Sequence, residues 1–528
     1  MASDTLTAAP AASALEPSQV VETANGKVQG YVFRGVSIFR GLPYGATTAG
    51  ANRFRPPQPP ASWTGVYSAL SYGETAPQSR GPLAEGGTPG NRPAIGEDCL
   101  RLNVWTPSAD QSRRPVMVWL HGGGFEAGSG SSMLYDGTNL CRRGDVVAVS
   151  INHRLGLFGH CHLADAAGGD FTGSANVGFL DIVAALEWVR DNIASFGGDP
   201  GNVTIYGQSG GGRKVSLAMA ARSSQGLYQR GIVQSGSHLR LLTPDQANDL
   251  TDRLFAEVEL KRGDVAGLQG LPMERLLKAN REVARATARR FSPTVDRAVF
   301  DTHPWDPTAP ALSADIPMMI GTCRTELSNQ LGNADPTLFD LDEAGLAQCL
   351  AEFVPAADVA ELIAVFRRTS PEATPSELFF KITTARGYWR DSVIQTERKA
   401  EQGGAPVWSY RVMWRTPIED GRRMTPHSTD LPFVFDNVSK AATMVGPADA
   451  ETAAMAEAMS ETWLTFARTG NPNNPAIPEW APYDLERRTV MLFDTPCVAA
   501  EDPHREERLV MDRYPTQQLG RTLHRQTL

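Results

Sequence analysis

A serine set between glycines is the first feature of this 528-residue chain that suggests chemistry. Ser209 lies in the sequence Gly-Gln-Ser-Gly-Gly over residues 207–211, which matches the pattern G-x-S-x-G. The preceding residues, 203–206, are β-branched or aromatic and predict a buried strand, and residues 215–220 predict a helix. A serine on a sharp turn between strand and helix is strained and exposed, which suits a nucleophile of acyl transfer. As a bare pattern, however, the motif also occurs in glycine-rich loops.

Three glycines elsewhere in the chain can supply donors to the negative charge that acyl transfer develops. Residues 122–124 are all glycine and follow His121 directly after the apolar run 116–120, which predicts a strand buried on both faces. Because glycine leaves its backbone N–H uncovered, we expect Gly123, Gly124 and Gly210 to form an oxyanion hole. Each such donor is worth about 2.7–4 kcal/mol in the transition state. The alternative is a glycine-rich turn in which His121 is only a structural hydrogen-bonding residue.

A serine hydroxyl is a weak nucleophile, so the site also needs a base and an acid that orients the base. The expected order of nucleophile, acid and histidine favours a histidine well beyond the serine. His427 follows a predicted strand at 407–412 and is the preferred base, because loops after strands often carry catalytic groups. Glu326 follows a predicted strand at 316–321 and is the candidate acid, with a solvated loop carboxylate as the alternative. The other downstream histidines are His238, His303, His504 and His524.

The elements that must position these residues alternate between strand and helix. Two apolar runs, 116–120 and 146–151, predict central parallel strands. Over residues 176–196 apolar side chains recur every three or four positions, which predicts an amphipathic helix before the strand of Ser209. Strand, helix and strand in this order imply a right-handed crossover. The sequence therefore predicts an α/β fold with a mostly parallel central sheet and helices on both faces.

The domain plan follows from composition and helix patterns. Residues 1–18 are rich in Ala, Pro, Ser and Thr and predict a mobile tail, and residues 19–528 predict a single catalytic domain. Helical segments near 243–290 and 337–400 interrupt the strands. We interpret them as insertions over the strand ends, where ligands bind in open α/β sheets. Capping boxes with proline at the first helical position begin at Thr243 and Thr374.

Charge, hydropathy and cysteine usage argue against some classes of partner and indicate a cellular location. The net charge of −9 is spread without long runs, which argues against a nucleic-acid partner. No stretch approaches the roughly 18 apolar residues that span a membrane, and the first residues lack a signal peptide's basic and apolar regions. The cysteines form no C-x-x-C pair, which argues against a zinc site and for a reducing, cytoplasmic location. They are Cys99, Cys141, Cys161, Cys323, Cys349 and Cys497.

In order and spacing, these motifs resemble the type B carboxylesterases, the family of carboxylesterases and cholinesterases within the α/β-hydrolase fold. The resemblance implies Ser209 as nucleophile, Glu326 as acid, His427 as general base, and the three glycine N–H groups as the oxyanion hole. It implies an acyl-enzyme route that hydrolyses small or medium uncharged esters with water and uses no metal or organic cofactor. The sequence does not set the oligomeric state. Other stretches that carry the resemblance are residues 39–44, 53–57, 97–104, 196–200, 207–212, 234–237 and 466–473.

Two departures from the family pattern flank the nucleophile. Gln208 replaces a glutamate, which removes a carboxylate beside the imidazolium, so we expect His427 to be less supported in its charged form. Gly210 replaces an alanine and should be harmless, because only its N–H is used. Arg213 and Lys214 in the following helix are expected to reach out to water rather than to bind an anion.

Another departure lies in the segment 68–98. It lacks the cysteine that pairs, in secreted relatives, with the one matching Cys99, so Cys99 is expected to be a free buried thiol. It also lacks the tryptophan with which cholinesterases bind quaternary ammonium, which disfavours choline esters. Amide, carbamate and polyester cleavage would use the same catalytic parts and remain alternatives. A non-catalytic binding module of the same fold is disfavoured, because the whole candidate site is present.

Overall fold

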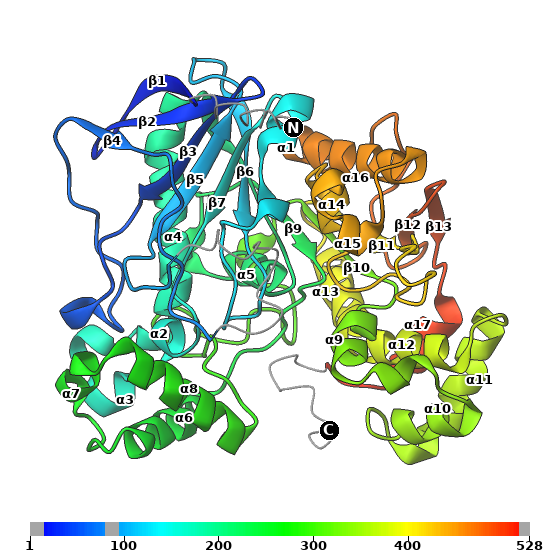
Figure 1. Ribbon diagram of the computed structural model, residues 1–528. Coiled ribbons are helices and arrows are strands. Elements are labelled where there is room, and N and C mark those ends of the chain that lie inside the picture. The colour runs from blue at the N-terminus through cyan, green and yellow to red at the C-terminus, as the bar shows by residue number, and fades with distance from the viewer. Residues whose placement is uncertain (1–14, 80–93, 517–528) are drawn as a thin grey trace, which may run out of the picture.

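A computed structural model describes residues 15–79 and 94–516 (Figure 1). Thirteen strands in these ranges form one sheet in the order β1-β2-β3-β5-β7-β6-β8-β9-β10-β11-β12-β13, with β4 paired to β2. All neighbours from β7 to β12 are parallel, and the outer pairs at both edges are antiparallel, except for the parallel pair of β2 and β4. The predicted parallel core is therefore confirmed. The strands are β1 (Glu16–Thr23), β2 (Gly26–Phe33), β3 (Val36–Pro43), β4 (Val66–Ser68), β5 (Arg101–Thr106), β6 (Arg114–Leu120), β7 (Val147–Ile151), β8 (Gly198–Gln208), β9 (Arg230–Gln234), β10 (Met318–Cys323), β11 (Val407–Val412), β12 (Thr489–Phe493) and β13 (Val498–Glu501).

Helices cover the sheet and extend beyond its strand ends (Figure 1). The helix predicted over 176–196 is α4, and the helix after Ser209 is α5. The α-helices are α1 (Thr138–Gly144), α2 (Gly156–His160), α3 (Ala164–Ala167), α4 (Val177–Asn192), α5 (Gly210–Ala218), α6 (Pro244–Glu257), α7 (Val265–Gly270), α8 (Met273–Thr287), α9 (Leu327–Ala334), α10 (Glu343–Leu350), α11 (Val359–Thr369), α12 (Pro375–Thr384), α13 (Arg390–Glu401), α14 (Leu431–Val434), α15 (Ala442–Val445), α16 (Ala450–Thr469) and α17 (Arg505–Met511).

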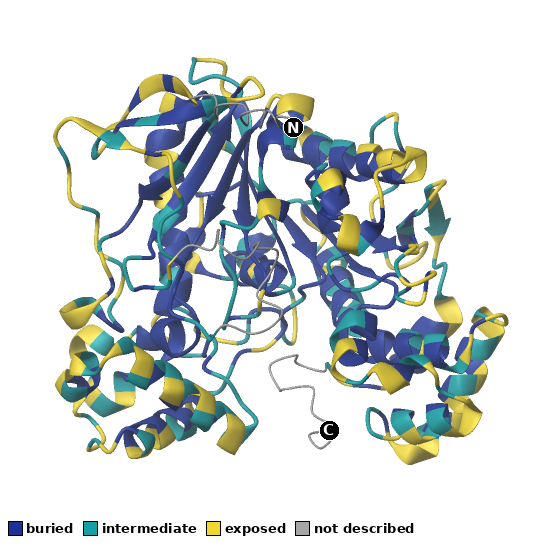
Figure 2. Ribbon diagram, viewed as in Figure 1, coloured by how far each residue is buried: buried dark blue, intermediate teal, exposed yellow. Residues whose placement is uncertain are grey.

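Strand β6 shows why the central strands are apolar on both sides. Val116, Val118 and Leu120 face the core that contains residues of α4 and α5, whereas Met117 and Trp119 face the core that contains residues of α16. All five side chains are fully buried. Figure 2 shows the same pattern for the whole sheet, with buried strands inside and exposed residues on the outward faces of the helices. Burial on both faces thus explains the unbroken apolar run of the sequence.

The two helical segments lie beyond the strand ends on either side of α5, with α6–α8 on one side and α9–α12 on the other (Figure 1). Both capping boxes are confirmed. The side chains of Thr243 and Thr374 accept from the N–H groups of Gln246 and Glu377, whose side chains in turn accept from the threonine N–H groups. The predicted bounds of the second segment are wrong at both ends. Helix α9 precedes residue 337, and α13 packs against β10 and β11 as part of the layer that covers the sheet.

The start of the chain is ordered sooner than the predicted tail allows. Strand β1 begins at Glu16, and the buried Ser18 side chain accepts a hydrogen bond of 3.0 Å from the N–H of Gly30. Residues 1–14 of the predicted tail lie outside the described residues. Among the helices of the two described ranges, none is both long enough and apolar enough to cross a membrane.

Candidate active site

Ser209 lies on the sharp turn that the sequence predicts. Strand β8 ends at Gln208, α5 begins at Gly210, and Ser209 between them has φ 57° and ψ −122°, a conformation that L-residues rarely adopt. A Cβ on Gly207 would lie 2.5 Å from the carbonyl carbon of Gly211, and one on Gly211 would lie 1.9 Å from a backbone oxygen of β6. Only glycines therefore allow strand and helix to approach this closely, and the half-buried serine stands at the apex of the turn.

The glycines after β6 form a tight turn beside Ser209. Gly123 and Gly124 have φ of 87° and 65°, and a Cβ on Gly123 would lie 2.3 Å from the carbonyl oxygen of Ala127. Within the described ranges, the N–H groups of Gly123, Gly124 and Gly210 have no hydrogen-bond acceptor. The N–H of Gly210 is the first of α5, and helix geometry gives it no acceptor within the helix. The position of a Cβ on Gly210 lies only 2.4 Å from the nitrogen of Gly124, so the donors are close to one another.

Lys214 supports this turn from behind. Its Nζ donates a hydrogen bond of 2.8 Å to the carbonyl oxygen of His121, and the lysine is fully buried. The His121 Nδ1 lies 2.9 Å from the carbonyl oxygen of Gly122, and its ring stacks on His153 with centroids 4.7 Å apart. Burial, reinforced by the charge of Lys214, lowers the pKa of His121 well below its ordinary value. His121 is therefore a neutral structural donor, and the expectation that Lys214 reaches water is wrong.

Glu326 and His427 form a buried pair at the ends of neighbouring strands. Glu326 follows β10 and His427 follows β11, so the parallel pairing of these strands brings both to the same edge of the sheet. The Nδ1 of His427 lies 2.5 Å from Oε2 of Glu326, whose Oε1 accepts from the N–H of Cys323 at 2.7 Å. The carboxylate thus accepts a hydrogen bond from Nδ1–H, which leaves Nε2 of His427 as an acceptor. The alternative of a solvated loop carboxylate does not fit a fully buried Glu326.

Gln208 connects this pair to the serine turn. Its Nε2 lies 3.2 Å from Nε2 of His427, so the free imidazole nitrogen lies beside the residue that precedes Ser209. A glutamine amide carries no negative charge, so the expectation drawn from the missing glutamate, that the charged form of His427 is less supported, stays a prediction.

Tyr388 is a member of the site for which the sequence gives no pattern. It lies in a π-helical turn (Ala385–Trp389) between α12 and α13, and its ring centroid is 5.0 Å from that of His427. Its hydroxyl accepts from Gln330 Nε2 at 2.9 Å and lies near enough to the Ser209 side chain to interact with it. Burial raises the pKa of Tyr388 to about 12, so the group is a neutral phenol. Tyr388 therefore keeps its O–H proton beside Ser209, while its oxygen accepts from Gln330.

The other candidate histidines of the described ranges and the cysteine thiols take no part in this arrangement. His238 packs on Phe125, His303 accepts from the N–H of Leu241 at 3.2 Å, and His504 packs on Trp389. His524 lies outside the described residues. Cys99 is free and buried as expected, and burial raises the pKa of its thiol. The described ranges contain no group of three His, Cys, Asp or Glu side chains placed to hold a metal ion.

These groups have the composition that acyl transfer needs. Acyl transfer needs a nucleophile, a base and charge stabilisation, and the matching groups here are a half-buried hydroxyl, an imidazole paired with a buried carboxylate, and N–H groups without acceptors. The site lies at the carboxyl ends of the parallel strands β6, β8, β10 and β11, where ligands bind in open α/β sheets.

Comparisons with known proteins give one consistent result. The family model described as "Carboxylesterase family" matches residues 17–511. The para-nitrobenzyl esterase of Bacillus subtilis is 34% identical over 501 residues, which are 93% of this chain and 98% of that protein. The solved carboxylesterase of Geobacillus stearothermophilus at pH 6.2 is 35% identical, with a TM-score of 0.80 over 93% of this chain and 99% of its own. An esterase from Clostridium hathewayi, described as able to hydrolyse aliphatic aromatic polyesters, is 32% identical, with a TM-score of 0.80 over 94% and 98% of the two chains.

Proposed function

The chain belongs to the carboxylesterase family, has the α/β-hydrolase fold and hydrolyses carboxylic esters with water, and on this premise we propose that Ser209 is the nucleophile. Glu326 and His427 complete the catalytic triad. The observation that carries this proposal is the 2.5 Å bond between His427 Nδ1 and Glu326 Oε2, next to a serine on a strained turn. A carboxylate in this position fixes the imidazole tautomer that accepts the serine proton.

The reaction proceeds in two halves through an acyl-enzyme. The Ser209 oxygen attacks the ester carbonyl while His427 Nε2 takes its proton, and the imidazolium returns that proton to the leaving alcohol. Water, activated by the same imidazole, then releases the acid. In both halves the N–H groups of Gly123, Gly124 and Gly210 donate to the oxyanion, each worth about 2.7–4 kcal/mol of transition-state stabilisation.

The neighbours of the triad tune these steps. The Gln208 amide lies against the His427 ring in the resting site, with its Nε2 3.2 Å from Nε2 and 3.4 Å from Nδ1 of the imidazole. Because Gln208 carries no charge, Glu326 is the carboxylate that hydrogen-bonds the imidazolium. The Tyr388 hydroxyl orients the Ser209 oxygen and, since it touches a reacting atom, acts as a catalytic residue.

Hydrolysis of p-nitrophenyl esters of increasing acyl length tests the triad. We expect Ser209→Ala to lower kcat by about 10³-fold or more and Glu326→Gln by about 10³–10⁴-fold, with smaller changes in KM. Ser439→Ala, at an exposed serine, is the matched control and should match the wild type. Wild-type kcat in Ser209→Ala would refute the assignment. The length profile of the wild type also measures whether small or medium acyl groups are preferred.

A polyester is the second candidate substrate, because one structural relative is described as hydrolysing polyesters. Release of soluble product from an aliphatic aromatic polyester film by the wild type, but not by Ser209→Ala, would support it. No release from the film at enzyme concentrations that hydrolyse p-nitrophenyl esters would exclude it.

We also propose that the enzyme works in the reducing cytoplasm. The supporting observation is that all six cysteines are free, four of them buried, although the chain is long enough to form disulfides. Dithiothreitol should leave the melting temperature unchanged, and six thiols should react with Ellman's reagent after denaturation without reductant. Fewer than six would contradict the proposal.

A further inference from the structure

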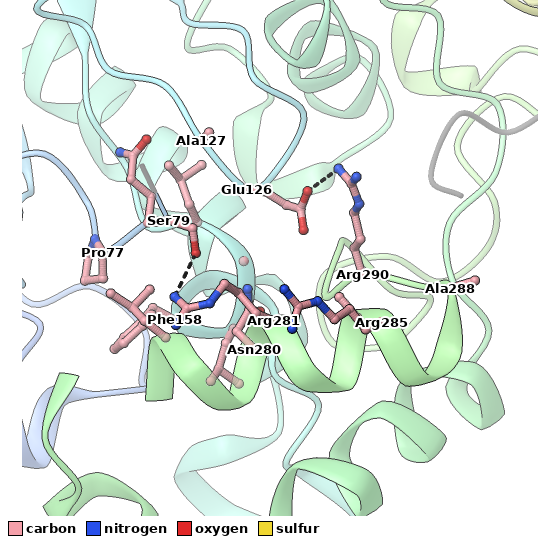
Figure 3. A pocket seen from close by; sticks show the side chains of 16 residues that line it. Pro77, Ser79, Glu126, Ala127, Phe158, Asn280, Arg281, Arg285, Ala288 and Arg290 are labelled. Atoms are coloured by element: carbon pink, nitrogen blue, oxygen red, sulfur yellow. Dashed lines mark hydrogen bonds and ion pairs between the residues drawn. The ribbon is translucent and has the colours of Figure 1, made fainter. Parts of the chain in front are cut away.

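A cavity of about 400 Å³ opens beside the glycine turn (Figure 3). This volume lies within the usual range of small-molecule sites. Glu126 and Ala127 form part of its wall, and their N–H groups donate to the carbonyl oxygen of Gly123 at 3.2 and 3.0 Å. The wall of the cavity therefore includes residues of the same turn that carries the N–H groups of the proposed oxyanion hole.

Arginines dominate the polar lining of this cavity. Arg281 and Arg285 are one turn apart on α8 and rise from the same face of the helix, and Arg290 follows the helix (Figure 3). Among the lining residues, the carboxylate is Glu126, and it is paired with Arg290. The described part of the lining thus carries three positive charges and one negative charge.

Two of the three arginines can still pair with an anion in the cavity. Arg281 donates to Ser79 Oγ at 3.3 Å and has no carboxylate within ion-pair distance in the described ranges. Arg285 pairs with Glu282 of its own helix at 3.1 Å, but its side chain is 74% exposed, so this pair is weak and easily exchanged. Two guanidinium groups are therefore available to an incoming anion.

Positive charge continues from the cavity toward the serine. Arg213 is on α5, four residues after Ser209, and is buried rather than extended to water as the sequence suggested. Burial lowers the pKa of Arg213, Tyr388 and Asp391 oppose this shift, and the charge of Arg290 adds to it, so Arg213 and Arg290 are near enough to interact. The site and the cavity share one electropositive region, which attracts anionic substrates.

Apart from Gln78, Ser79 and Asn280, the rest of the described lining is largely hydrocarbon. It comes from the loop and helix that follow β7 and from α8: Leu155, Leu157, Phe158, Leu277 and Ala284. An apolar wall with guanidinium groups on one side fits a ligand that has a hydrocarbon chain and ends in an anion. The planar fork of a guanidinium matches the two oxygens of a carboxylate.

We propose that this arginine cavity binds a carboxylate carried by the substrate, so that the enzyme prefers esters with an acidic group at the end of a short hydrocarbon chain. The proposal rests on the proposed function, because it places the ester bond at Ser209. It differs from the sequence-based expectation of uncharged esters. The sequence does not reveal that residues of α8 and of the glycine turn line one cavity.

Paired substrates that differ only in charge test the preference. The first pair is the mono-p-nitrophenyl ester of suberic acid and the same compound with its free acid methylated. The acid should have a kcat/KM at least about tenfold above that of the methyl ester at low salt, mostly through KM, and added salt should erase the advantage. The second pair, p-carboxyphenyl butyrate and its methyl ester, carries the charge on the alcohol side. A preference in one pair identifies the side that the cavity holds, and no preference in either pair overturns the proposal.

Variants of α8 assign the preference to the cavity. In Arg281→Gln/Arg285→Gln the ratio of kcat/KM between acid and methyl ester should fall to about one, since neutral amides cannot pair with a carboxylate. Arg275→Gln is the matched control, because Arg275 is on the same helix, pairs with Glu257 and does not line the cavity. An unchanged ratio in the double variant, or an equal loss in the control, overturns the proposal.

Failure of this inference is distinguishable from failure of the proposed function. If Ser209→Ala still hydrolyses both esters at the wild-type rate, the nucleophile is misassigned. If Ser209→Ala is inactive but the wild type does not distinguish acid from methyl ester, the triad stands and the carboxylate preference is wrong.

Discussion

At the scale of single residues, Gly210 shows that a small departure from the family pattern is not neutral in this chain. The sequence suggested that glycine in place of alanine is harmless, because only the N–H is used. The structure shows that a Cβ on Gly210 would lie 2.2 Å from the oxygen and 2.4 Å from the nitrogen of Gly124. The Gly124 peptide thus occupies the space that an alanine methyl would need.

Gly210→Ala should therefore displace the Gly124 peptide and weaken the oxyanion hole. We expect kcat for p-nitrophenyl esters to fall by about tenfold or more with a smaller change in KM, because the loss is confined to the transition state. Gly270→Ala is the matched control, since a Cβ there meets no atom within 4 Å. An unchanged kcat in Gly210→Ala would show that the turn adjusts without cost.

Asp430 makes stability depend on pH. It is fully buried, one carboxyl oxygen accepts from Gln234 Nε2 at 2.6 Å, and the other has no partner among the described residues. Burial raises its pKa from 3.8 to about 6. The protonated form favours the folded state, so this contribution is complete below about pH 4 and is lost as the pH rises through about 6.

Asp430→Asn should remove that pH dependence. The variant and the wild type should be equally stable at pH 4, and above pH 6 the variant should be more stable by on the order of 2 kcal/mol. Denaturant unfolding at both pH values measures the difference, with the exposed Asp420→Asn as the control. Greater stability of the wild type at pH 8 would contradict the sign.

At the scale of elements, helix α17 binds the end of the strand that precedes Glu326, the proposed catalytic acid. Glu507 of α17 accepts two hydrogen bonds of 2.7 Å from Arg324, two residues before Glu326, and one of 2.8 Å from Thr369. Burial alone would raise the pKa of Glu507, but the charge and hydrogen bonds of Arg324 hold it well below its ordinary range. The helix is thus fastened by a buried ion pair.

Glu507→Gln should destabilise the protein by about 3–5 kcal/mol, because it leaves Arg324 buried without its charge partner. The neighbouring Glu506→Gln removes an exposed pair with Arg368 and should cost less than about 1 kcal/mol. Thermal or denaturant unfolding of both variants provides the comparison. Equal effects of the two substitutions would mean that α17 contributes little through this pair.

Local patterns predicted the elements but not the packing between them. The apolar strands, the helix before β8 and both capping boxes are set by residues close in sequence, and each is confirmed. The pair of Glu326 and His427 was predicted from chain order and resemblance, since the two are 101 residues apart. No local pattern marks Tyr388, because its position depends on a π-helical turn within a helical run. The burial of Arg213 and Lys214 depends on how α5 packs under neighbouring loops, which their sequence does not reveal.

At the scale of the whole molecule, segments from both halves of the chain build one sheet. Strands β1–β9 precede the first helical segment and β10–β13 follow it, and β9 and β10 are hydrogen-bonded neighbours. We therefore propose that the described residues from β1 to α17 form a single catalytic domain with helical insertions. Unfolding followed by tryptophan fluorescence and by far-ultraviolet circular dichroism should give coincident transitions, and separated transitions would argue for independent domains.

The most direct test of the central claim is to locate the covalent bond that the enzyme forms. Diethyl p-nitrophenyl phosphate, which phosphorylates an activated serine, should add one diethylphosphoryl group to the wild type, on the peptide that contains Ser209, as activity is lost. Ser209→Ala should gain none under the same conditions. A label on any other residue that accompanies inactivation, or equal labelling of Ser209→Ala, would contradict the assignment of Ser209 as the nucleophile.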